Sequence, residues 1–336
     1  MPLNYKPSGI CDFHVHIGEK INGYELRDDF PDLEKIAQET GIAGIGAFVT
    51  EEAGLSLTAK LKKMQEKARL NYNGKVHWHL TPIHTKTEEL FPLLQEGWDL
   101  KLYTTYKESG LYSSYEQIEH WMEELSDIKT RILVHCEDDR IITQSSAEHP
   151  FHTPLDHTLR RPELAEIVAV EKVLNLAIKH SHPIHIVHIS SPKAAILVKE
   201  AKSEYPLITC ETAPHYLIYN ENQLIGENAH RWLCTPPFRS EESRGLLVEL
   251  MQDGYFDIIA SDHCPFKLED KDRFKDNLPL LPCGIPGLGT IYSSMFKNFV
   301  EPKIISQAYL DEMTIYKPKN LMSCFKRYKY EKSFQE

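Results

Sequence analysis

The sequence has little of what marks a secreted, membrane-spanning or disulfide-stapled protein. Its seven cysteines are scattered and include no CxxC pair, which argues against a disulfide framework and for reduced thiols. No apolar run of about 18 residues occurs, so we expect no membrane span. The first residues contain no continuous apolar segment of the kind found in secretory signals. These absences predict a cytoplasmic protein.

An excess of positive charge is also missing. The formal net charge is −11, which opposes binding to nucleic acid through its phosphates. Hydrophobic residues make up 41% and charged residues 26%, an ordinary balance that excludes collagen-like and disordered classes. Histidine is the residue in unusual supply, with 17 copies, several of them in HxH spacing. The 336 residues allow either two average domains or one large α/β barrel.

Short apolar runs alternate with helical patterns along the chain. The runs predict strands at 9–17, 42–50, 75–83, 98–104, 131–137, 182–190, 206–212 and 256–263. Helical patterns fall at 56–69, 115–125, 163–180, 192–203 and 240–253. Apolar strands separated by helices indicate parallel strands buried on both faces, and this series predicts a TIM (β/α)8 barrel. A doubly wound sheet is the alternative, but the glycine-rich loop that usually follows its first strand is missing.

Three segments of the sequence are irregular. Residues 138–162 and 264–290 are predicted to form long loops after the fifth and eighth strands, at the end of the barrel where active sites lie. The segment from about 316 is basic and aromatic, which predicts a surface helix with a frayed end. We expect one catalytic barrel over 1–325 and a C-terminal tail over 326–336.

Two histidines, His14 and His16, stand on the first predicted strand. Alternate residues of a strand point to the same side, so both imidazoles can reach one metal ion. The same spacing recurs at 77–79 and 180–182, so an isolated pair is weak evidence. The histidines that we interpret as structural or helix-terminal are His77, His79, His182 and His185.

Stronger evidence comes from polar residues near the ends of the other strands. Lys101 lies on the fourth strand and His135 on the fifth. His188 lies on the sixth and Asp262 on the eighth. Each falls in or just past an apolar run, where an unpaired polar group is costly. Together with the HxH pair, these residues predict a two-metal centre at the mouth of the barrel. The alternative is a set of separately satisfied polar residues.

Lys101 needs its own explanation, because two divalent cations would repel an ammonium group. Carbon dioxide can convert a lysine amine into an anionic carbamate, and the two carbamate oxygens can bridge two metal ions. A barrel lysine that neutralises a nearby carboxylate is the alternative.

A series of short motifs spans roughly residues 9–325. The motifs are DFHVH (12–16), LKLY (100–103), LVHCED (133–138), IVHIS (186–190), CETAPHYL (210–217), CTPPFR (234–239), SDHCPF (261–266) and GIPGLGT (284–290). In this order they resemble the amidohydrolase superfamily, in the branch of dihydroorotases, dihydropyrimidinases (hydantoinases) and allantoinases. The resemblance is closest overall to dihydroorotase-like proteins.

The resemblance implies a zinc-dependent hydrolase of cyclic amides. The zinc ligands that it implies are His14, His16 and Asp262 for the more buried ion, His135 and His188 for the other, and carboxylated Lys101 as a bridge together with a hydroxide. The hydroxide would be the nucleophile. Asp262 would take its proton as general base and return it to the leaving nitrogen as general acid.

The motifs disagree about which ring is hydrolysed. His215 in APHYL and the GIPGLGT segment resemble dihydroorotases. That family commonly has an arginine for the substrate carboxylate two residues after the second histidine, but Gly18 stands there. The asparagine that usually ends its second strand is also replaced, since this strand ends AFVTEE (47–52). In hydantoinases a tyrosine five residues after the lysine assists the oxyanion, and Tyr106 has that offset, although it can equally be a packing residue.

Further substrate contacts are predicted around the mouth. His215 follows the seventh strand and would touch the substrate or leaving group, unless it is only a hydrogen-bonded strand end. Backbone groups near Pro237 and Gly287 could recognise a planar ureide or imide. His152 and His157 lie in the polar loop and are expected to be solvated.

Four functional hypotheses remain. The first is a dihydroorotase-like enzyme, and the second is a hydrolase of a dihydropyrimidine, hydantoin or other ureide. The third is a catalytically silent scaffold homologue, which the intact ligand positions oppose. The fourth is a metal-dependent nuclease, which the acidic charge opposes.

The predicted partners and domain content follow from the first two hypotheses. We expect a small cyclic amide or ureide as substrate, no nucleic acid or membrane partner, and a possible homodimer. Relatives usually add a small β-sandwich built from chain on both sides of the barrel. The chain before His14 is short and the C-terminal tail has a helical pattern, so we expect this domain to be reduced or absent.

Overall fold

Eight parallel strands form the barrel, which confirms the predicted TIM (β/α)8 fold. The computed structural model describes residues 7–21 and 23–323. The strands, in their order around the barrel, are β1 (Ile10–Val15), β4 (Ile42–Thr50), β5 (Lys75–Thr81), β6 (Asp99–Tyr103), β7 (Ile132–His135), β8 (Ile184–Ile186), β9 (Ile208–Thr212) and β10 (Ile258–Ile259). A bridge between Val15 and His263 joins the first strand to the segment after the last. A short hairpin, β2 (Lys20–Ile21) and β3 (Tyr24–Glu25), lies outside this sheet.

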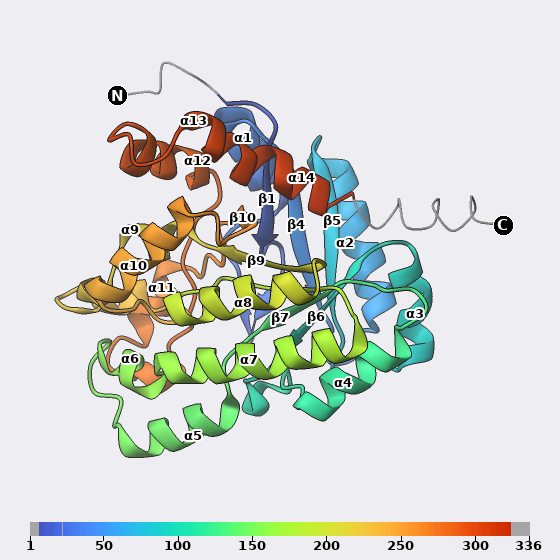
Figure 1. Ribbon diagram of the computed structural model, residues 1–336, viewed down its shortest axis with the longest axis horizontal. Helices are drawn as coiled ribbons and strands as arrows, with labels where there is room; N and C mark the ends of the chain where they lie inside the picture. Colours follow the sequence, from blue (N-terminus) through green and yellow to red (C-terminus); the bar gives the residue numbers. More distant parts are fainter. Residues whose placement is uncertain (1–6, 22, 324–336) are drawn as a thin grey trace.

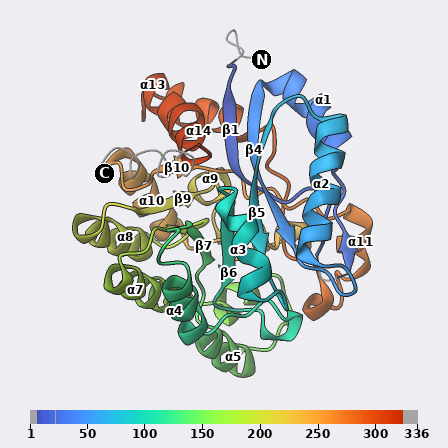
Figure 2. The same cartoon turned by 90° about the vertical axis from the view of Figure 1, so that its right-hand side faces the viewer.

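Helices surround the sheet on its outer side (Figure 1, Figure 2). The helices of the described chain, some of which lie at the ends of the barrel, are α1 (Phe30–Thr40), α2 (Leu57–Asn71), α3 (Thr87–Gln95), α4 (Tyr115–Glu124), α5 (Asp139–Glu148), α6 (Asp156–Arg160), α7 (Glu163–His180), α8 (Pro192–Glu204), α9 (Pro214–Ile218), α10 (Glu241–Gln252), α11 (Leu268–Arg273), α12 (Ile291–Met295), α13 (Gln307–Asp311) and α14 (Lys317–Leu321). Short 3-10 segments occur at Lys107–Ser109, Glu221–Leu224, Ala229–Trp232 and Leu278–Leu280, and π-helical segments at Phe296–Val300 and Glu312–Tyr316.

The five predicted helices are confirmed as α2, α4, α7, α8 and α10. The predictions of irregular loops over 138–162 and 264–290 are wrong, because α5 and α6 lie within the first segment and α11 lies within the second. Asp138 caps α5 through its side chain, which accepts a hydrogen bond from the backbone N–H of Ile141. No residue of α5 is buried, so the helix carries no apolar stripe that a sequence pattern could reveal.

Two apolar layers hold the barrel together. The larger lies between the sheet and the helices and contains residues such as Val15, Ile45 and Leu174. A smaller cluster, which includes Phe13, Phe48 and Leu133, joins residues of several barrel strands. Filling a barrel with side chains leaves a packed core rather than a pore, so the chemistry is confined to the strand ends.

A buried polar network accompanies Phe13 in the barrel. Asp99 Oδ2 lies 2.8 Å from His77 Nε2 and 2.7 Å from an Arg131 guanidinium nitrogen. The rings of His79 and His185 lie 4.7 and 5.3 Å from the Phe13 ring, between centroids. His182 Nε2 lies 2.7 Å from the carbonyl of Thr130. These contacts fit a structural role for His77, His79, His182 and His185.

Of the two histidines that were predicted to be solvated, one is exposed and the other is buried. His152 is exposed, as predicted. The prediction that His157 is solvated is wrong, because it is buried in α6 and its Nε2 lies 3.0 Å from the carbonyl of Cys234. Its neighbour Phe151 stacks on the imidazole with 5.7 Å between centroids. The sequence around His157 is polar, so its burial comes from tertiary packing alone.

The C-terminal helices pack against the beginning of β1, at the end of the barrel away from the loops (Figure 1). Leu321 and Met322, at the end of α14, pack on the smaller apolar cluster. Residues 324–336 lie outside the described part, so the predicted frayed end and the division at 325 stay predictions. Among the described residues, no helix is both long and apolar enough to cross a membrane.

Candidate metal centre at the mouth of the barrel

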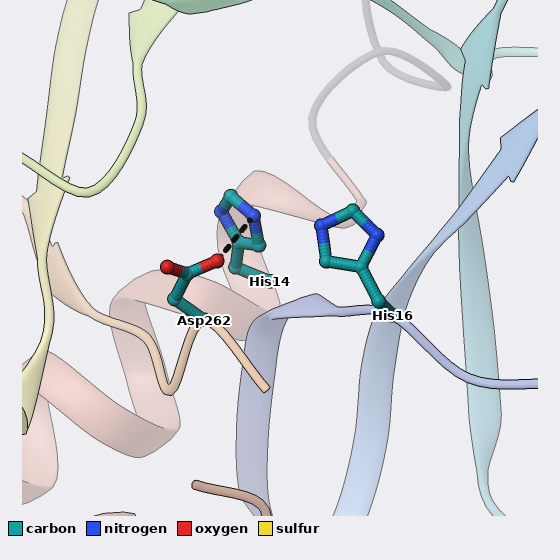
Figure 3. Close-up of side chains that lie close together, drawn as sticks. All are labelled: His14, His16 and Asp262. Atoms are coloured by element: carbon teal, nitrogen blue, oxygen red, sulfur yellow. Dashed lines mark ion pairs between the residues drawn. The ribbon is translucent and has the colours of Figure 1, made fainter. Parts of the chain in front are cut away.

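His14, His16 and Asp262 meet at the carboxyl ends of the first and last strands (Figure 3). One potential ligand atom from each lies within 4.8 Å of the other two. His14 Nε2 and Asp262 Oδ1 are 3.1 Å apart. His14 is buried, whereas His16 and Asp262 are partly exposed at the mouth. The three side chains therefore form a compact group of nitrogen and oxygen donors.

His188 and His135 extend this group along the mouth. The ring centroid of His188 lies 5.3 Å from that of His14 and 4.5 Å from that of His135. Both histidines are buried, and they lie beside the three-residue group rather than within its 4.8 Å limit. The structure thus brings together all four histidines that the sequence singles out.

The backbone is unusual at these positions. The pairing of β1 with β4 shifts register between Asp12 and Val15, around His14. His188 and Asp262 have φ angles of 39° and 49°, and Tyr106 has 72°. Residues other than glycine rarely adopt this left-handed backbone conformation, and such strained residues cluster at functional sites. The local backbone therefore aims these side chains at the mouth instead of continuing a regular strand.

A buried carboxylate stands behind three of the four histidines. Glu211 on β9 contacts His14 Nδ1. Glu137 Oε2 lies 2.7 Å from His135 Nε2, and Glu19 Oε2 lies 3.7 Å from His16 Nδ1. Carboxylates in this position fix the ring orientation and the tautomer of metal-ligating histidines. The free nitrogens are then Nε2 of His14 and Nδ1 of His135, whereas Glu19 is too far from His16 for a hydrogen bond.

The carboxylates themselves are anchored. Arg161 pairs with Glu137 at 2.6 Å, and its guanidinium carbon lies 5.2 Å from the ring centroid of Tyr106. The backbone N–H of Thr50 donates to Glu19 at 2.7 Å, and Lys60 Nζ lies 3.7 Å from the same carboxylate. Sequence reasoning missed Glu19, Glu137 and Glu211 as functional candidates. Their only signal was a position inside or next to a motif that had been interpreted for its histidines.

Burial keeps most of these imidazoles neutral. It lowers the pKa of His16, lowers that of His135 to about 4, and lowers that of His188 well below its usual value. Burial has the same effect on His14, but the carboxylates of Glu211 and Asp262 outweigh it and raise the pKa of His14 to about 9. Neutral imidazole is the form that binds a metal ion.

Lys101 lies on β6. Its side chain is buried, and its Nζ has no hydrogen-bond partner among residues 7–21 and 23–323. The Nζ lies 4.9 Å from the ring centroid of Tyr103 and 5.2 Å from that of Phe48. Burial lowers the pKa of Lys101 to about 7. A neutral amine, the form that reacts with carbon dioxide, is therefore accessible near neutral pH.

These residues fit a pair of divalent cations. Imidazole nitrogens and carboxylate oxygens are ordinary zinc ligands. Lys101 Nζ and His188 Nδ1 are buried without a hydrogen-bond partner within the described chain, which is costly unless another group engages them. Metal-ligating histidines ordinarily donate a hydrogen bond from their second nitrogen to a carboxylate, and the carboxylates described above can accept such bonds.

Tyr106 and His215 are the remaining predicted catalytic residues besides Asp262. The Tyr106 ring centroid is 5.2 Å from that of His135, and burial raises the pKa of its hydroxyl. His215 is the second residue of α9, which closely follows β9, and its Nε2 is buried without a hydrogen-bond partner in the part of the chain that is described. Burial lowers the pKa of His215 to about 4, so its imidazole is neutral.

The three predicted backbone contacts differ in their surroundings. Pro237 is buried. Gly287 donates its N–H to His263 Nδ1 at 3.1 Å and accepts from the backbone N–H of Thr290 at 3.1 Å, so both of its backbone groups have partners. Gly18 has a φ of 62°, and a Cβ there would lie 2.7 Å from Asp29 Oδ1. Position 18 therefore faces a carboxylate.

Comparison with known proteins gives relatives along almost the whole chain. No family model matches the sequence. The chain is 30% identical over 338 residues to a dihydroorotase of Listeria monocytogenes serotype 4b, covering 95% of this chain and 72% of the relative. It is 25% identical over 321 residues to a dihydroorotase of Brevibacillus brevis, covering 93% of this chain and 72% of the relative.

Solved structures show the same fold. A dihydropyrimidinase from Brevibacillus agri NCHU1002 superposes with a TM-score of 0.86 at 24% identity, covering 94% of this chain and 70% of that one. A D-hydantoinase superposes with a TM-score of 0.84 at 21% identity, covering 91% of this chain and 69% of that one. At these identities the likeness shows the fold alone. The sequence relatives, and above all the one at 30% identity, confirm the branch that the motifs resemble.

Proposed function

Because the chain belongs to the dihydroorotase family of the amidohydrolase superfamily, we propose that it hydrolyses a cyclic amide reversibly, with dihydroorotate as the nearest named substrate. The observation that carries this proposal is the meeting of His14, His16 and Asp262 within 4.8 Å at the carboxyl end of the barrel. Barrel enzymes place their chemistry at this end. The product of ring opening would be N-carbamoyl-aspartate or its counterpart from a related ring.

Two zinc ions are the proposed cofactors. His14, His16 and Asp262 would hold one ion, His135 and His188 the other, and carboxylated Lys101 would bridge them. Bound zinc supplies a water of lowered pKa and polarises the amide carbonyl. The buried carboxylates Glu211 and Glu137 support this assignment, because they leave one nitrogen each of His14 and His135 free for a metal.

Asp262 is the proposed general base and acid. Burial alone would raise the pKa of its carboxyl, but His14, His188 and His215 outweigh burial and hold the pKa well below its usual range. Asp262 is therefore ionised at neutral pH and can accept the proton of the attacking water. It can then deliver that proton to the leaving ring nitrogen, which needs it to depart as the neutral NH2 of the carbamoyl group.

Tyr106 and His215 are proposed to act on the substrate. Tyr106 keeps its hydroxyl proton, since burial raises its pKa, and can donate a hydrogen bond to the oxyanion. The neutral His215 can accept or donate a hydrogen bond at the ring. Backbone groups near Gly18, Pro237 and Gly287 are proposed as further substrate contacts.

An uncharged dihydropyrimidine, hydantoin or allantoin-type ureide is the second candidate substrate. The observation that favours it is the surroundings of Gly18, where the nearest side chain is the carboxylate of Asp29, which already pairs with Lys67. A hydrogen-bonded charge pair contributes about 1.5–3 kcal/mol, so dihydroorotate is expected to bind with a high KM.

A substrate panel decides between these candidates. Dihydroorotate, dihydrouracil, hydantoin and allantoin are each tested as substrates, and ring opening is measured by the loss of ring absorbance. We expect the zinc-loaded enzyme to open dihydroorotate. The Asp262→Asn variant is the control for background hydrolysis. Turnover of the uncharged rings without any turnover of dihydroorotate would replace the first candidate by the second.

Zinc affinity should depend on pH because of His14. Its pKa of about 9 means that the metal-free chain holds a proton on His14 below that pH, and a metal ion must displace it. We expect zinc affinity to rise about tenfold per pH unit between pH 6 and 8. Competition with a chelator of known affinity at several pH values measures this slope. A flat profile over that range would contradict the proposed role of His14.

The remaining proposals concern the setting of the enzyme. We propose a cytoplasmic location, a small-molecule substrate without nucleic-acid or membrane partners, and a homodimer. We also propose that residues 1–325 act as one catalytic barrel, with 326–336 as a tail. Size-exclusion chromatography with light scattering would test the homodimer.

A further inference from the structure

One buried carboxylate, Glu211, connects both halves of the candidate metal centre. It lies on β9 and is 1% exposed. Its Oε1 contacts His14 Nδ1 and lies 3.4 Å from the backbone nitrogen of His188. Its Oε2 lies 3.2 Å from His185 Nε2. The carboxylate therefore joins β1 to the end of β8 from the neighbouring strand β9.

His185 anchors Glu211 on the side away from the mouth. The second nitrogen of His185, Nδ1, lies 2.8 Å from the hydroxyl of Thr209, and that hydroxyl donates to the carbonyl of Ile184 at 3.2 Å. This chain of contacts gives each oxygen of Glu211 a fixed imidazole partner. The carboxylate thus has little freedom to rotate away from His14.

The contact with Glu211 decides which nitrogen His14 presents. A carboxylate only accepts hydrogen bonds, so His14 Nδ1 must carry the proton and donate it. Nε2 is left facing Asp262 at 3.1 Å. The backbone N–H of His188 donates to Glu211 Oε1 at 3.4 Å, and His188 is also a residue with a left-handed backbone conformation.

We infer that Glu211 is a positioning residue that orients His14 and His188 together, so that ligands of both proposed zinc ions are held by one side chain. This inference rests on the proposed function, because it assigns Glu211 a role toward the zinc centre. Glu211 touches no substrate in this role. A glutamine of the same size would keep the packing, but its amide could point either an oxygen or an NH2 group at His14, and the tautomer would no longer be fixed.

The test is zinc affinity of folded Glu211→Gln, measured by competition with a chelator at one pH. We expect a 10–100-fold loss relative to the unmodified chain, as is typical for a lost outer carboxylate. Asp99→Asn is the matched control, because Asp99 is also a buried carboxylate between two imidazoles but contacts none of the proposed zinc ligands. It should lower the melting temperature and leave zinc affinity within about twofold of the unmodified chain.

His185→Gln is a second variant in case Glu211→Gln does not fold. It removes the anchor of Glu211 without touching a proposed ligand, so zinc affinity should again fall relative to Asp99→Asn. The inference is overturned if Glu211→Gln or His185→Gln, when folded, binds zinc as tightly as the Asp99→Asn control. Failure of the unmodified chain to bind zinc would instead contradict the proposed function, so the two failures are distinguishable.

Discussion

Exchanging Asp262 for asparagine is expected to lower kcat by about 10³-fold while the barrel stays folded. Asparagine has the same size, so the packing around β10 is kept, but its amide cannot take a proton from water at neutral pH. Proton transfer by a positioned side chain contributes about 10²–10⁴-fold to rate. Asp262 also lies 3.1 Å from His14 Nε2, so the same exchange removes a proposed ligand. Steady-state turnover with the best substrate of the panel measures the loss.

Asp257→Asn is the matched control for Asp262→Asn. Asp257 lies at the beginning of the same strand, where it accepts a hydrogen bond from the backbone N–H of Cys210 at 2.9 Å and pairs with Lys202. It belongs to the opposite end of the barrel, so its exchange should affect stability and not kcat. If Asp262→Asn keeps activity within tenfold of the unmodified enzyme and of Asp257→Asn, Asp262 is not the general base.

The strand-end residues of the candidate site could be predicted from sequence because barrel geometry fixes where they go. His14, His188 and Asp262 each end or follow an apolar run, and parallel strands bring such ends to one face. These residues are far apart along the chain, so only the barrel fold predicts that they meet. Conversely, polar residues at several strand ends are what a barrel active site requires, so each hypothesis supported the other. The same reasoning placed Lys101 at the end of the fourth strand, in the same set.

The supporting residues could not be predicted, because their partners are set by tertiary contacts. In the sequence, Glu211 was only one residue of the CETAPHYL motif (210–217) and was given no role. Nothing in the chain near it indicates that it would meet His14, which is 197 positions away. His157 shows the same limit, since a polar neighbourhood predicted exposure and a contact to Cys234 buries it.

Helices without an apolar stripe formed the second limit. α5 buries none of its residues and is held by the Asp138 cap and by its place between neighbouring elements. α1 is a different case, because it begins with a capping box built by Asp29 and Asp32 and buries Phe30, Leu33 and Ala37, yet no helix was predicted there. Caps are local signals and were available in the sequence, whereas the burial of a helix face was not.

Replacing Lys101 with alanine is expected to lower kcat by about 10³-fold or more and to weaken zinc binding. Metal polarisation of a carbonyl is worth several kcal/mol, and each 1.36 kcal/mol corresponds to about a tenfold change in rate. The physical reason lies in the lysine itself. Its Nζ is buried without a hydrogen-bond partner in the described chain, so as an ammonium it would be an unpaired charge, whereas as a carbamate it becomes an anion able to bridge two cations.

Lys271→Ala is the matched control for Lys101→Ala. Lys271 is also a buried lysine, but its Nζ donates to the carbonyls of Arg231 and Leu233 at 2.9 and 3.1 Å. Its hydrogen-bonding need is therefore met without any reaction with carbon dioxide. We expect Lys271→Ala to lose stability but to keep the zinc stoichiometry of the unmodified enzyme.

Two measurements separate a carbamate from a plain buried amine at Lys101. Carbon-13-labelled bicarbonate should give a carbamate signal in the NMR spectrum of the zinc-loaded enzyme and of Lys271→Ala, and none in Lys101→Ala. A small carboxylate such as acetate fits the space left by the missing side chain and supplies the same two oxygens, so it should restore part of the activity of Lys101→Ala. Full activity of Lys101→Ala without added carboxylate would show that the centre works without a carbamate, and that Lys101 is only a packed barrel residue.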